Sequence, residues 1–516
     1  MSLFTQPGHA STADLLMDDP RVAGAASIET SGHRHSVRVL PDPRWLEAQT
    51  RHASVAASRS LLGWQSTHDL ADRVPQRAPQ PGLDGWADSF TGRPPSDGAM
   101  RVWLDAIASR LLALPHARVR EIGCGTGLLV RELATHCRVY EASDVSAVAV
   151  SQLRAWLATR DDLRHVRTRR QPAHEGGGAA AGFDLVVINA VAQHFPDADY
   201  LRTVLDAAWR DVAPGGHLVV GDVRLLGLQS TLVAASTLAR APGGTPVHAL
   251  RQSIHATWLA QSDLALDPAF FHRFASACGA SVAVRLKPGD DALEMMRYRC
   301  DVVLGKPASA QAVSLPAASL DSVEALRGWL AAGRPGRVLL RAQPDARLAA
   351  DIAAHRLIAS AVDSMLVREV RRLVALQVVA DRPASGPEFF HNIPLPYQVP
   401  RGAGGSDPAA IAALCAAQGC STMLLATPYA QDARFDLLVE RHAAGAGTGQ
   451  VPDLQPAPDS GPLDDPALAS HPLLLQSLRR LSASLYNELA RLLPEADMPA
   501  RILPVVRRDQ LIHGAP

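Results

Sequence analysis

The middle of the chain alternates between short apolar runs and stretches in which apolar residues recur at helical spacing. Apolar side chains between Met100 and Leu114 repeat every three or four positions, which predicts a helix. The almost wholly apolar run Phe183–Asn189 predicts a buried parallel strand. The other expected elements are strands over 119–122, 138–142 and 217–222 and helices over 145–157 and 200–212. Because strands and helices alternate, the pattern predicts a doubly wound α/β sheet.

The composition divides the chain into three zones. Residues 1–85 are rich in Ala, Ser, Arg and His and end in a stretch with several prolines. Residues 86–306 hold the alternating pattern, and residues 307–516 include a loose stretch rich in Gly, Pro and Asp at 443–462. We therefore expect a central Rossmann-like domain flanked by two smaller α+β regions. No internal repeat is visible in the sequence.

Bulk properties narrow the class of protein. An apolar share of 47% over 516 residues fits about two to four packed domains. Lysine plus arginine equal aspartate plus glutamate, at 51 each, so no charge excess indicates nucleic acid or a membrane surface as a partner. The six cysteines lack metal-ligand spacing, and the N-terminus lacks the basic start and apolar core of a signal peptide. We expect a cytoplasmic protein with free thiols, no metal and no membrane span.

The strongest chemical signal is the sequence Glu121-Ile122-Gly123-Cys124-Gly125-Thr126-Gly127, between an expected strand and an expected helix. A glycine turn at such a junction brings a ligand to a helix N-terminus. A dinucleotide fingerprint needs its third glycine one position later, where Leu128 stands. The observed spacing instead resembles the first motif of class I S-adenosylmethionine (SAM) methyltransferases, whose glycines let the backbone approach the cofactor closely. Cys124 is expected to fill the loop and not to act as a nucleophile.

Polar residues after the next two strands extend the expected SAM pocket. Asp144 is positioned to accept hydrogen bonds from the ribose hydroxyls, with Val145 beside it. The alternative is that Asp144 caps the following helix. His174 and Glu175 suit a loop that presents a polar side chain to the adenine, or else a solvated loop.

Four residues at and after the end of the Phe183–Asn189 strand suggest both cofactor and acceptor contacts. Asn189 and Ala190 are expected beside SAM, because polar strand ends face the ligand in this architecture. Gln193 can position the substrate or SAM through its amide. His194 is a candidate general base, because an imidazole titrates near neutral pH. The alternative is a histidine that only orients its loop.

Two charged residues end the strand expected at 217–222. Asp222 can orient or deprotonate an amine, so we predict a catalytic role for it. Arg224 can hold a carboxylate or phosphate of the substrate. The alternative for both is a structural ion pair.

Seven segments taken in order resemble the methyltransferase domains that are embedded in nonribosomal peptide synthetases. They are residues 85–92, 121–127, 140–146, 189–196, 220–224, 267–271 and 297–304. The resemblance implies that 85–92 forms a lid near the cofactor, although Phe90 replaces the usual tyrosine. It also implies that Glu294 contacts a substrate amine as a catalytic residue, and that Arg297 and Tyr298 line the same cleft. His194 stands where the family often has tyrosine.

The flanks carry a second resemblance. Residues 19–26 and 492–501 are similar to the start and the closing stretch of the small C-terminal subdomain of an adenylation domain. The catalytic lysine and the large adenylation subdomain of that family are missing. The resemblance therefore implies a stand-alone methyltransferase-like protein with adenylation remnants that does not activate amino acids with ATP. Gly336–Arg341 and Phe435–Val439 fit strands of the connecting region, with a structural or docking role.

Three functions follow from these interpretations. The first is SAM-dependent methyl transfer in secondary metabolism to a nitrogen of a small amine, an amino acid or a carrier-bound aminoacyl group. The second is cyclisation of SAM to a small-ring amino acid of the azetidine-2-carboxylate type, with release of methylthioadenosine. The third is a non-catalytic docking protein for a nonribosomal peptide synthetase. The expected partners are the acceptor, free or on a carrier protein, and such a synthetase.

Overall fold

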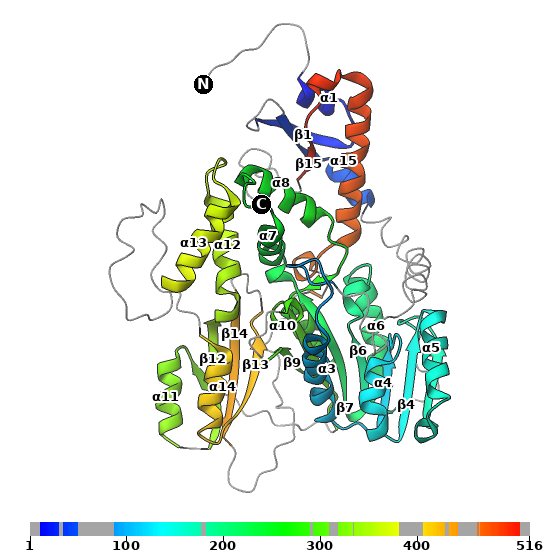
Figure 1. The fold of residues 1–516 in the computed structure, drawn as a ribbon. Helices are drawn as coiled ribbons and strands as arrows, with labels where there is room; N and C mark the ends of the chain where they lie inside the picture. The colour runs from blue at the N-terminus through cyan, green and yellow to red at the C-terminus, as the bar shows by residue number, and fades with distance from the viewer. Residues whose placement is uncertain are drawn as a thin grey trace.

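The computed structural model describes residues 11–29, 35–49, 87–176, 182–288, 293–308, 318–333, 335–380, 406–428, 433–441, 462–463 and 465–505. The described elements form a long sheet with helices on its faces and a separate small sheet above it (Figure 1). Among the described residues, no helix combines the length and the apolar character needed to cross a membrane.

The central part of the chain forms the expected doubly wound sheet. From its outer edge inward the strands are β5 (Val166–Arg170), β4 (Val139–Asp144), β3 (Arg118–Ile122), β6 (Phe183–Asn189), β7 (Val212–Leu225), β10 (Arg299–Gly305) and β9 (Ser281–Leu286). The first five are parallel, β10 and β9 are antiparallel to their neighbours, and the short β8 (Ala265–Leu266) also pairs with β7. The helices of this part are α3 (Asp97–Leu112), α4 (Leu128–Leu133), α5 (Ala147–Leu157), α6 (Ala198–Asp211), α7 (Gln229–Arg240), α8 (Val247–Leu259), α9 (Pro268–Cys278) and α10 (Glu294–Arg297). The predicted fold class is confirmed.

Strand β6 shows why an almost wholly apolar run sits at the centre of this sheet. Val186 and Ile188 belong to the core on one face, and Leu185 and Val187 belong to the core on the other. All four are fully buried, as expected for a parallel strand covered by helices on both sides. The carboxyl ends of β3, β4, β6 and β7 consequently meet at one edge of the sheet, where the polar strand-end residues lie.

A second set of elements extends the sheet beyond β9 and repeats the order of the first. Its members are β11 (Ala318–Leu320), α11 (Val323–Ala331), β12 (Gly336–Pro344), α12 (Ala349–Ser360), α13 (Val367–Ala380), α14 (Pro408–Ala416), β13 (Ser421–Ala426) and β14 (Arg434–Arg441). The same succession of element types occurs in β6, α6, β7, α7, α8, α9, β9 and β10. The expectation of no internal repeat was therefore wrong, and we call these two sets the first copy and the second copy.

The two ends of the described chain form one small unit. Strand β2 (His35–Pro41) pairs with β1 (Val22–Glu29) on one side and with β15 (Ile502–Pro504) on the other. Helices α1 (Thr12–Met17) and α15 (Pro472–Leu492) pack on these strands. Buried side chains from both ends share one core: Leu16, Val37, Val39, Leu481, Leu485, Leu489 and Ile502. The two segments that resemble the adenylation subdomain, 19–26 and 492–501, thus lie in the same unit. The composition had placed them in separate regions, 1–85 and 307–516, whereas their resemblance had assigned both to one subdomain.

Candidate active site

The glycine loop begins directly after β3, and its three glycines have different surroundings. All three have positive φ values, of 79° at Gly123, 50° at Gly125 and 90° at Gly127, which favour glycine. A Cβ on Gly123 would overlap Val191, and one on Gly127 would overlap Leu153. A Cβ on Gly125 would meet no protein atom within 4 Å. Gly123 and Gly127 are therefore packed against the protein, whereas Gly125 faces open space that a ligand can fill.

Asp144 fastens this loop to the end of the neighbouring strand β4. Its Oδ2 accepts a hydrogen bond of 2.8 Å from the Gly125 amide, and its Oδ1 accepts one of 2.8 Å from the Ser146 amide. Helix α5 is capped by Ser146, whose Oγ accepts from Ala149 N, and not by Asp144. The Asp144 side chain is half-buried at the carboxyl edge of the sheet, next to Gly125 and Val145. Its expected contact with the ribose remains a prediction.

Glu121 lies beneath the loop and is almost inaccessible to solvent. Tyr140 Oη donates a hydrogen bond of 2.6 Å to Glu121 Oε2. Burial raises the pKa of Glu121 to about 8, so this carboxyl group holds a proton at neutral pH. Burial also raises the pKa of the Cys124 thiol well above its usual value. A buried thiol with a high pKa is a poor nucleophile, in agreement with a filling role for Cys124.

The segment after β6 presents two buried oxygen atoms without a hydrogen-bond partner. These are Asn189 Oδ1 and Gln193 Oε1. Ala190 has a φ of 57° and donates its amide to Gly221 O on β7, while Gln193 Nε2 donates to Ala190 O at 2.9 Å. Asn189 Oδ1 packs against Gly221 on β7. Unpartnered buried acceptors are costly, so Gln193 Oε1 suits a group with an N–H or O–H donor.

His194 follows Gln193 in the short helical turn Ala192–His194, at the same edge of the sheet. It is half-buried, and its Nε2 lies 3.4 Å from Gln193 Nε2. An imidazole can accept a proton, and the neighbouring Gln193 amide contacts its ring. His194 thus lies close to Gln193, Asn189 and Ala190 at one edge of the sheet, and their contacts with cofactor or acceptor remain predictions.

The loop after β5 crosses the sheet toward α6. His174 Nδ1 lies 3.0 Å from Tyr200 Oη, and Tyr200 in turn contacts the Phe195 ring edge-on at 5.0 Å between centroids. The Glu175 side chain is exposed, but its carbonyl oxygen accepts a hydrogen bond from Arg120. His174 therefore lies on the flank of the turn that carries His194. A contact of His174 or Glu175 with an adenine remains a prediction.

Asp222, expected to be a catalytic residue, is instead the centre of a buried ionic cluster. Its side chain has no exposed surface; it pairs with Arg299 and accepts a hydrogen bond of 2.9 Å from Trp103 Nε1. Lys287 Nζ lies 3.4 Å from Asp222 and 2.7 Å from Asp301. Burial alone would raise the pKa of Asp222, but the charges of Arg299 and Lys287 lower it below its usual value.

A carboxylate enclosed in this way cannot reach an acceptor amine. The structure therefore contradicts the expected base role of Asp222 and supports the alternative of a structural ion pair. The partner is Arg299 and not the nearby Arg224. Lys287, Arg299 and Asp301 were missed by the sequence analysis. The sequence feature that could have indicated this cluster is the presence of two charges, Arg299 and Asp301, in the otherwise apolar strand β10.

Glu294 and Arg224 also pair with protein groups. Glu294 Oε1 lies 3.2 Å from Arg224 Nη1 and 3.5 Å from Arg299 Nη2. Glu294 Oε2 accepts a hydrogen bond from Ser89 N at 3.1 Å, and Arg224 Nε lies 2.7 Å from Asp263. This geometry fits a wall of the cleft that holds the segment around Ser89. It does not fit Glu294 as a group that transfers a proton, because its side chain is almost fully buried.

Arg297 and Tyr298 reach across to the second copy. Arg297 Nη1 and Tyr298 Oη both donate to Asp351 Oδ2, at 2.6 and 2.7 Å. The guanidinium of Arg297 lies 5.1 Å from the centroid of the Phe90 ring, which is itself 6.3 Å from the Tyr298 ring. The expected lid residue Phe90 thus packs on both expected cleft residues, whereas Gly85 and Trp86 lie outside the described residues. Nothing in the sequence indicated Asp351.

Comparison with known proteins supports a methyltransferase domain at this site. The family model of a methyltransferase domain matches residues 120–218, which include the glycine loop, Asp144 and the end of β6. Among solved structures, the chain is similar to the N-methyltransferase NodS from Bradyrhizobium japonicum, with 20% identity, a TM-score of 0.28 and coverage of 41% of this chain and 98% of that one. It is also similar to magnesium protoporphyrin IX methyltransferase from Synechocystis, with 16% identity, a TM-score of 0.31 and coverage of 40% and 84%.

Two synthetases are similar over most of the chain. Chondramide synthase of Chondromyces crocatus is 31% identical over 381 residues, which cover 71% of this chain and 10% of the synthase. A probable non-canonical nonribosomal peptide synthetase of Salinispora arenicola is 31% identical over 434 residues, which cover 82% of this chain and 5% of the synthetase. The chain thus spans a tenth or less of the length of these two relatives.

The buried Glu121 predicts a distinctive dependence of stability on pH. Its pKa is about 8 in the folded protein against an ordinary value of 4.5, so the folded state holds the proton more tightly than the unfolded state. The stabilising contribution is complete below pH 4.5 and is lost as the pH rises toward 8. The free energy of unfolding of the wild type should therefore fall relative to Glu121→Gln between pH 5 and 8, as measured by urea denaturation. The exposed Glu324→Gln serves as control, and parallel curves for wild type and Glu121→Gln would contradict the argument.

Proposed function

We propose that this chain, which carries a class I SAM-dependent methyltransferase domain similar to those embedded in nonribosomal peptide synthetases, N-methylates an amine. The acceptor is a small amine or an amino acid, either free or as an aminoacyl group on a carrier protein. A synthetase that supplies such a carrier is the proposed partner. The observation that carries the proposal is the open space at Gly125, bounded by the glycine loop and Asp144.

The residues at this edge fit SAM in three respects. Gly125 leaves room for a ligand against the backbone, because a Cβ there would meet no protein atom. The Asp144 carboxylate lies beside Gly125 and has lone pairs to accept hydrogen bonds from ribose hydroxyls. Asn189 ends β6 at this edge and is half-buried, so its side-chain amide is a candidate partner for the amino group of SAM. SAM supplies a methyl group on a sulfonium, which is already an activated donor.

The task left to the protein is to align the acceptor and to remove its proton. Gln193 Oε1 is a buried acceptor without a partner and can hold an N–H of the amine. His194 lies next to Gln193 and can take the second proton from the nitrogen as the new bond forms. Glu294 and Arg224 close the cleft by holding Ser89, so their role is to position the wall and to exclude water.

The direct test is incubation of the purified protein with SAM, with and without amine acceptors and carrier-bound aminoacyl groups. Formation of S-adenosylhomocysteine only when an acceptor is present supports the proposal. Release of methylthioadenosine from SAM alone indicates cyclisation instead. Absence of SAM binding, together with capture of a carrier protein, indicates a docking protein. Mass spectrometry separates all three outcomes.

Gly125→Val should abolish SAM binding, because its side chain would occupy the open space beside Asp144. The strain of a positive φ is matched by Gly279→Val, since Gly279 has a φ of 67° and open space around it at the end of α9. We expect Gly125→Val to lower SAM affinity by at least about 100-fold and Gly279→Val to leave it unchanged, as measured by calorimetry. Equal affinities of the two variants would refute the assignment of this space to SAM.

His194→Gln should slow methyl transfer by roughly 100-fold while SAM affinity stays constant, because only the proton acceptor is lost. The loss should shrink as the pH rises, since more of the amine is then unprotonated without help from the protein. Single-turnover rates from pH 6 to pH 10 measure this. A variant whose rate and pH profile match those of the wild type would show that His194 only orients its loop.

A further inference from the structure

The second copy matches the first residue by residue. Residues 336–379 lie 120 positions after residues 216–259, without a gap. Asp222 and Ala342, which correspond at this spacing, both have positive φ values, 64° and 49°. The amide of Asp222 donates to Asp301 Oδ1 at 2.9 Å, and the amide of Ala342 donates to Asp436 Oδ1 at 2.7 Å. An unusual backbone conformation and its side-chain partner thus occur in both copies.

Other contacts repeat as well. Leu225 N donates to Tyr298 O at 3.1 Å, and its counterpart Asp345 N donates to Ala433 O at 2.8 Å. The side chains that donate to the two buried aspartates, Lys287 and Thr427, are each followed by proline. Helices α9 and α14 both begin with an Asp-Pro sequence whose aspartate accepts a hydrogen bond of 2.9 Å from the amide two positions later. These contacts indicate a duplication and not two unrelated α/β units.

The two copies face each other across an approximate twofold axis. Val247 N donates to Met365 O at 2.8 Å, and Val367 N donates to Thr245 O at 2.9 Å. Arg251 donates to the carbonyl oxygens of Ile358, Ala359 and Ala361 at the end of α12. Its counterpart Arg371 donates to those of Leu238, Ala239 and Ala241 at the end of α7. An interface in which each contact occurs twice in this way is the hallmark of a symmetric dimer.

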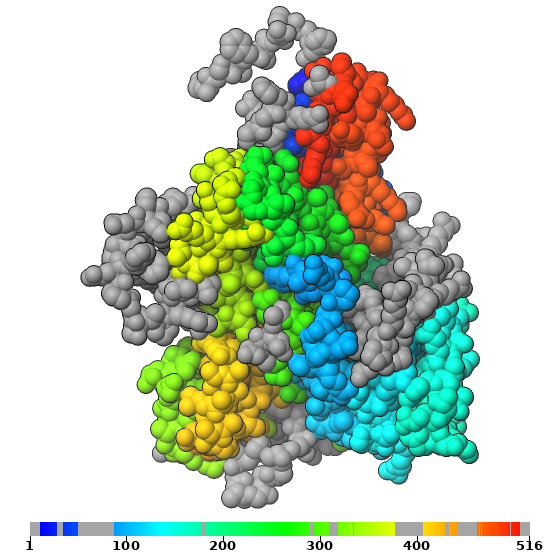
Figure 2. Space-filling model, in the orientation of Figure 1, coloured from blue at the N-terminus to red at the C-terminus, as the bar shows by residue number. Residues whose placement is uncertain are grey.

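The buried residues of this interface obey the same symmetry. Helices α7 and α8 pack against α12 and α13 and lie side by side with them (Figures 1 and 2). Their shared core consists of Ala234, Leu238, Val247 and Leu250 together with the counterparts Ala354, Ile358, Val367 and Val370. The edge strands also meet symmetrically, since β9 pairs with β13 at the equivalent residues Arg285 and Leu425. The contact therefore resembles a homodimer interface contained within one chain.

The second copy is not a second active site. In the described residues it has no counterpart of β3, β4 and β5 or of the glycine loop. Ala342 stands in place of Asp222, and Thr427 in place of Lys287, so the buried charges of the first copy are reduced to one aspartate and a hydroxyl. Arg434, the counterpart of Arg299, donates to Ala342 O and lines a pocket instead.

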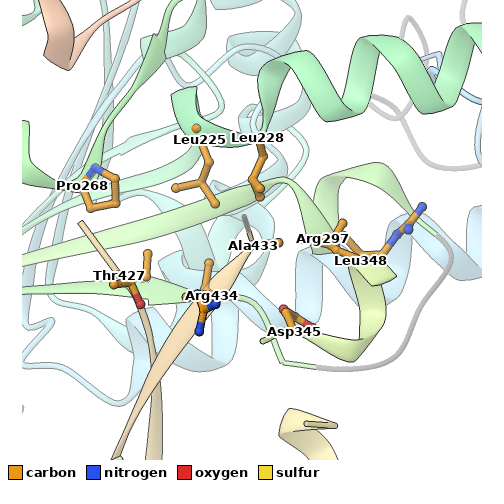
Figure 3. A pocket seen from close by; sticks show the side chains of 12 residues that line it. Leu225, Leu228, Pro268, Arg297, Asp345, Leu348, Thr427, Ala433 and Arg434 are labelled. Atoms are coloured by element: carbon orange, nitrogen blue, oxygen red, sulfur yellow. The ribbon is translucent and has the colours of Figure 1, made fainter. Parts of the chain in front are cut away.

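This pocket lies between the two copies, next to Arg297 (Figure 3). Its cavity volume is about 20 Å3, and it opens to solvent. Leu225 and Leu228 line it from the first copy, and Asp345 and Leu348, their counterparts, line it from the second. Arg297 lies at one side of the pocket and is held there by Asp351.

From these contacts we propose that the second copy, residues 318–441, is an inactive duplicate that serves as a built-in second subunit, and that its Asp351 positions the acceptor side of the cleft through Arg297 and Tyr298. The positioning part rests on the proposed function. Asp351 is a positioning residue, because it acts through Arg297 and Tyr298. Phe90 packs on these two side chains, and it follows Ser89, whose amide donates to Glu294. Its counterpart in the first copy is Thr231, so this carboxylate is specific to the second copy.

The decisive comparison is between Asp351→Ala and Arg371→Ala. Both remove hydrogen bonds between the copies, but Arg371 does so at the end of α7 and touches neither Arg297 nor Tyr298. Asp351→Ala should raise the acceptor KM about tenfold, as expected for two lost hydrogen bonds to one charged group, with SAM affinity unchanged. Asp351→Glu, which keeps the carboxylate, should restore part of the loss. Arg371→Ala should lower the Tm without changing the acceptor KM.

Hydrogen exchange provides a readout that needs no acceptor. Asp351→Ala should speed amide exchange over residues 88–92, because Phe90 loses its fixed support, and Arg371→Ala should not. If both variants change exchange and acceptor KM equally, or if Asp351→Ala changes neither, the positioning role is overturned. A wild-type protein without SAM turnover but with the expected exchange pattern would overturn the proposed function and leave the positioning role intact.

The built-in subunit has its own test. Arg251 and Arg371 make equivalent contacts with the ends of α12 and α7, and Arg251 adds an ion pair with Asp363. Each alanine variant should therefore lower the Tm, Arg251→Ala by at least as much as Arg371→Ala, and the monomeric protein should unfold in a single transition. Two separate transitions, or an Arg371→Ala variant as stable as the wild type, would show that the copies do not act as one folded pair.

Discussion

The buried ionic cluster of Asp222, Asp301, Lys287 and Arg299 is the interaction on which the central sheet and its active-site edge depend. It joins β7, β9 and β10, and Arg110 ties it to α3 on the face of the sheet. Charges withdrawn from water in this way are tolerated only when each has partners, and removal of one partner typically costs about 3–5 kcal/mol. The cluster also holds the backbone of Asp222 at its positive φ. Two residues later in β7, Arg224 pairs with Glu294.

The second copy shows which part of that arrangement is structural. It retains the bulge at Ala342 and the aspartate that receives its amide, Asp436, but Thr427 replaces the lysine at 287. The backbone turn therefore requires one carboxylate and one donor. The additional cations of the first copy compensate the second carboxylate, Asp222, and extend the cluster to Glu294 through Arg299. The charges of the first copy extend the cluster toward Glu294, and the turn itself occurs in the second copy with fewer of them.

How much the sequence could reveal depended on how local each interaction is. The glycine loop, the position of Asp144 and the limits of β6 were predictable, because neighbouring residues determine them. The role of Asp222 was not, since a polar residue at a strand end looks the same whether it meets a ligand or an arginine 77 positions later. The duplication was not visible in the sequence, because the two copies share buried positions and backbone conformation more than residue identity. Few residues besides Gly216, Leu228, Val247 and Arg251 recur unchanged at the equivalent positions. The resemblance of both chain ends to one subdomain indicated that they belong together, but the residues of their shared core depend on pairing at long range and were not predicted.

The duplication also answers a physical problem of the fold. Strand β9 would be an open edge of the methyltransferase sheet, and α7 and α8 would expose an apolar face. The second copy covers both, and the sheet then ends at β11, which has only three residues and offers little backbone for further pairing. The other side of α8 packs against the small unit formed by the chain ends, where Leu259 contacts Leu475 and Leu478 of α15. The α7–α8 hairpin is thus the place where all three parts of the molecule meet. Since it begins directly after β7 leaves the active-site edge, the hairpin joins the small unit to the central sheet, whereas the second copy also reaches that edge directly through Asp351.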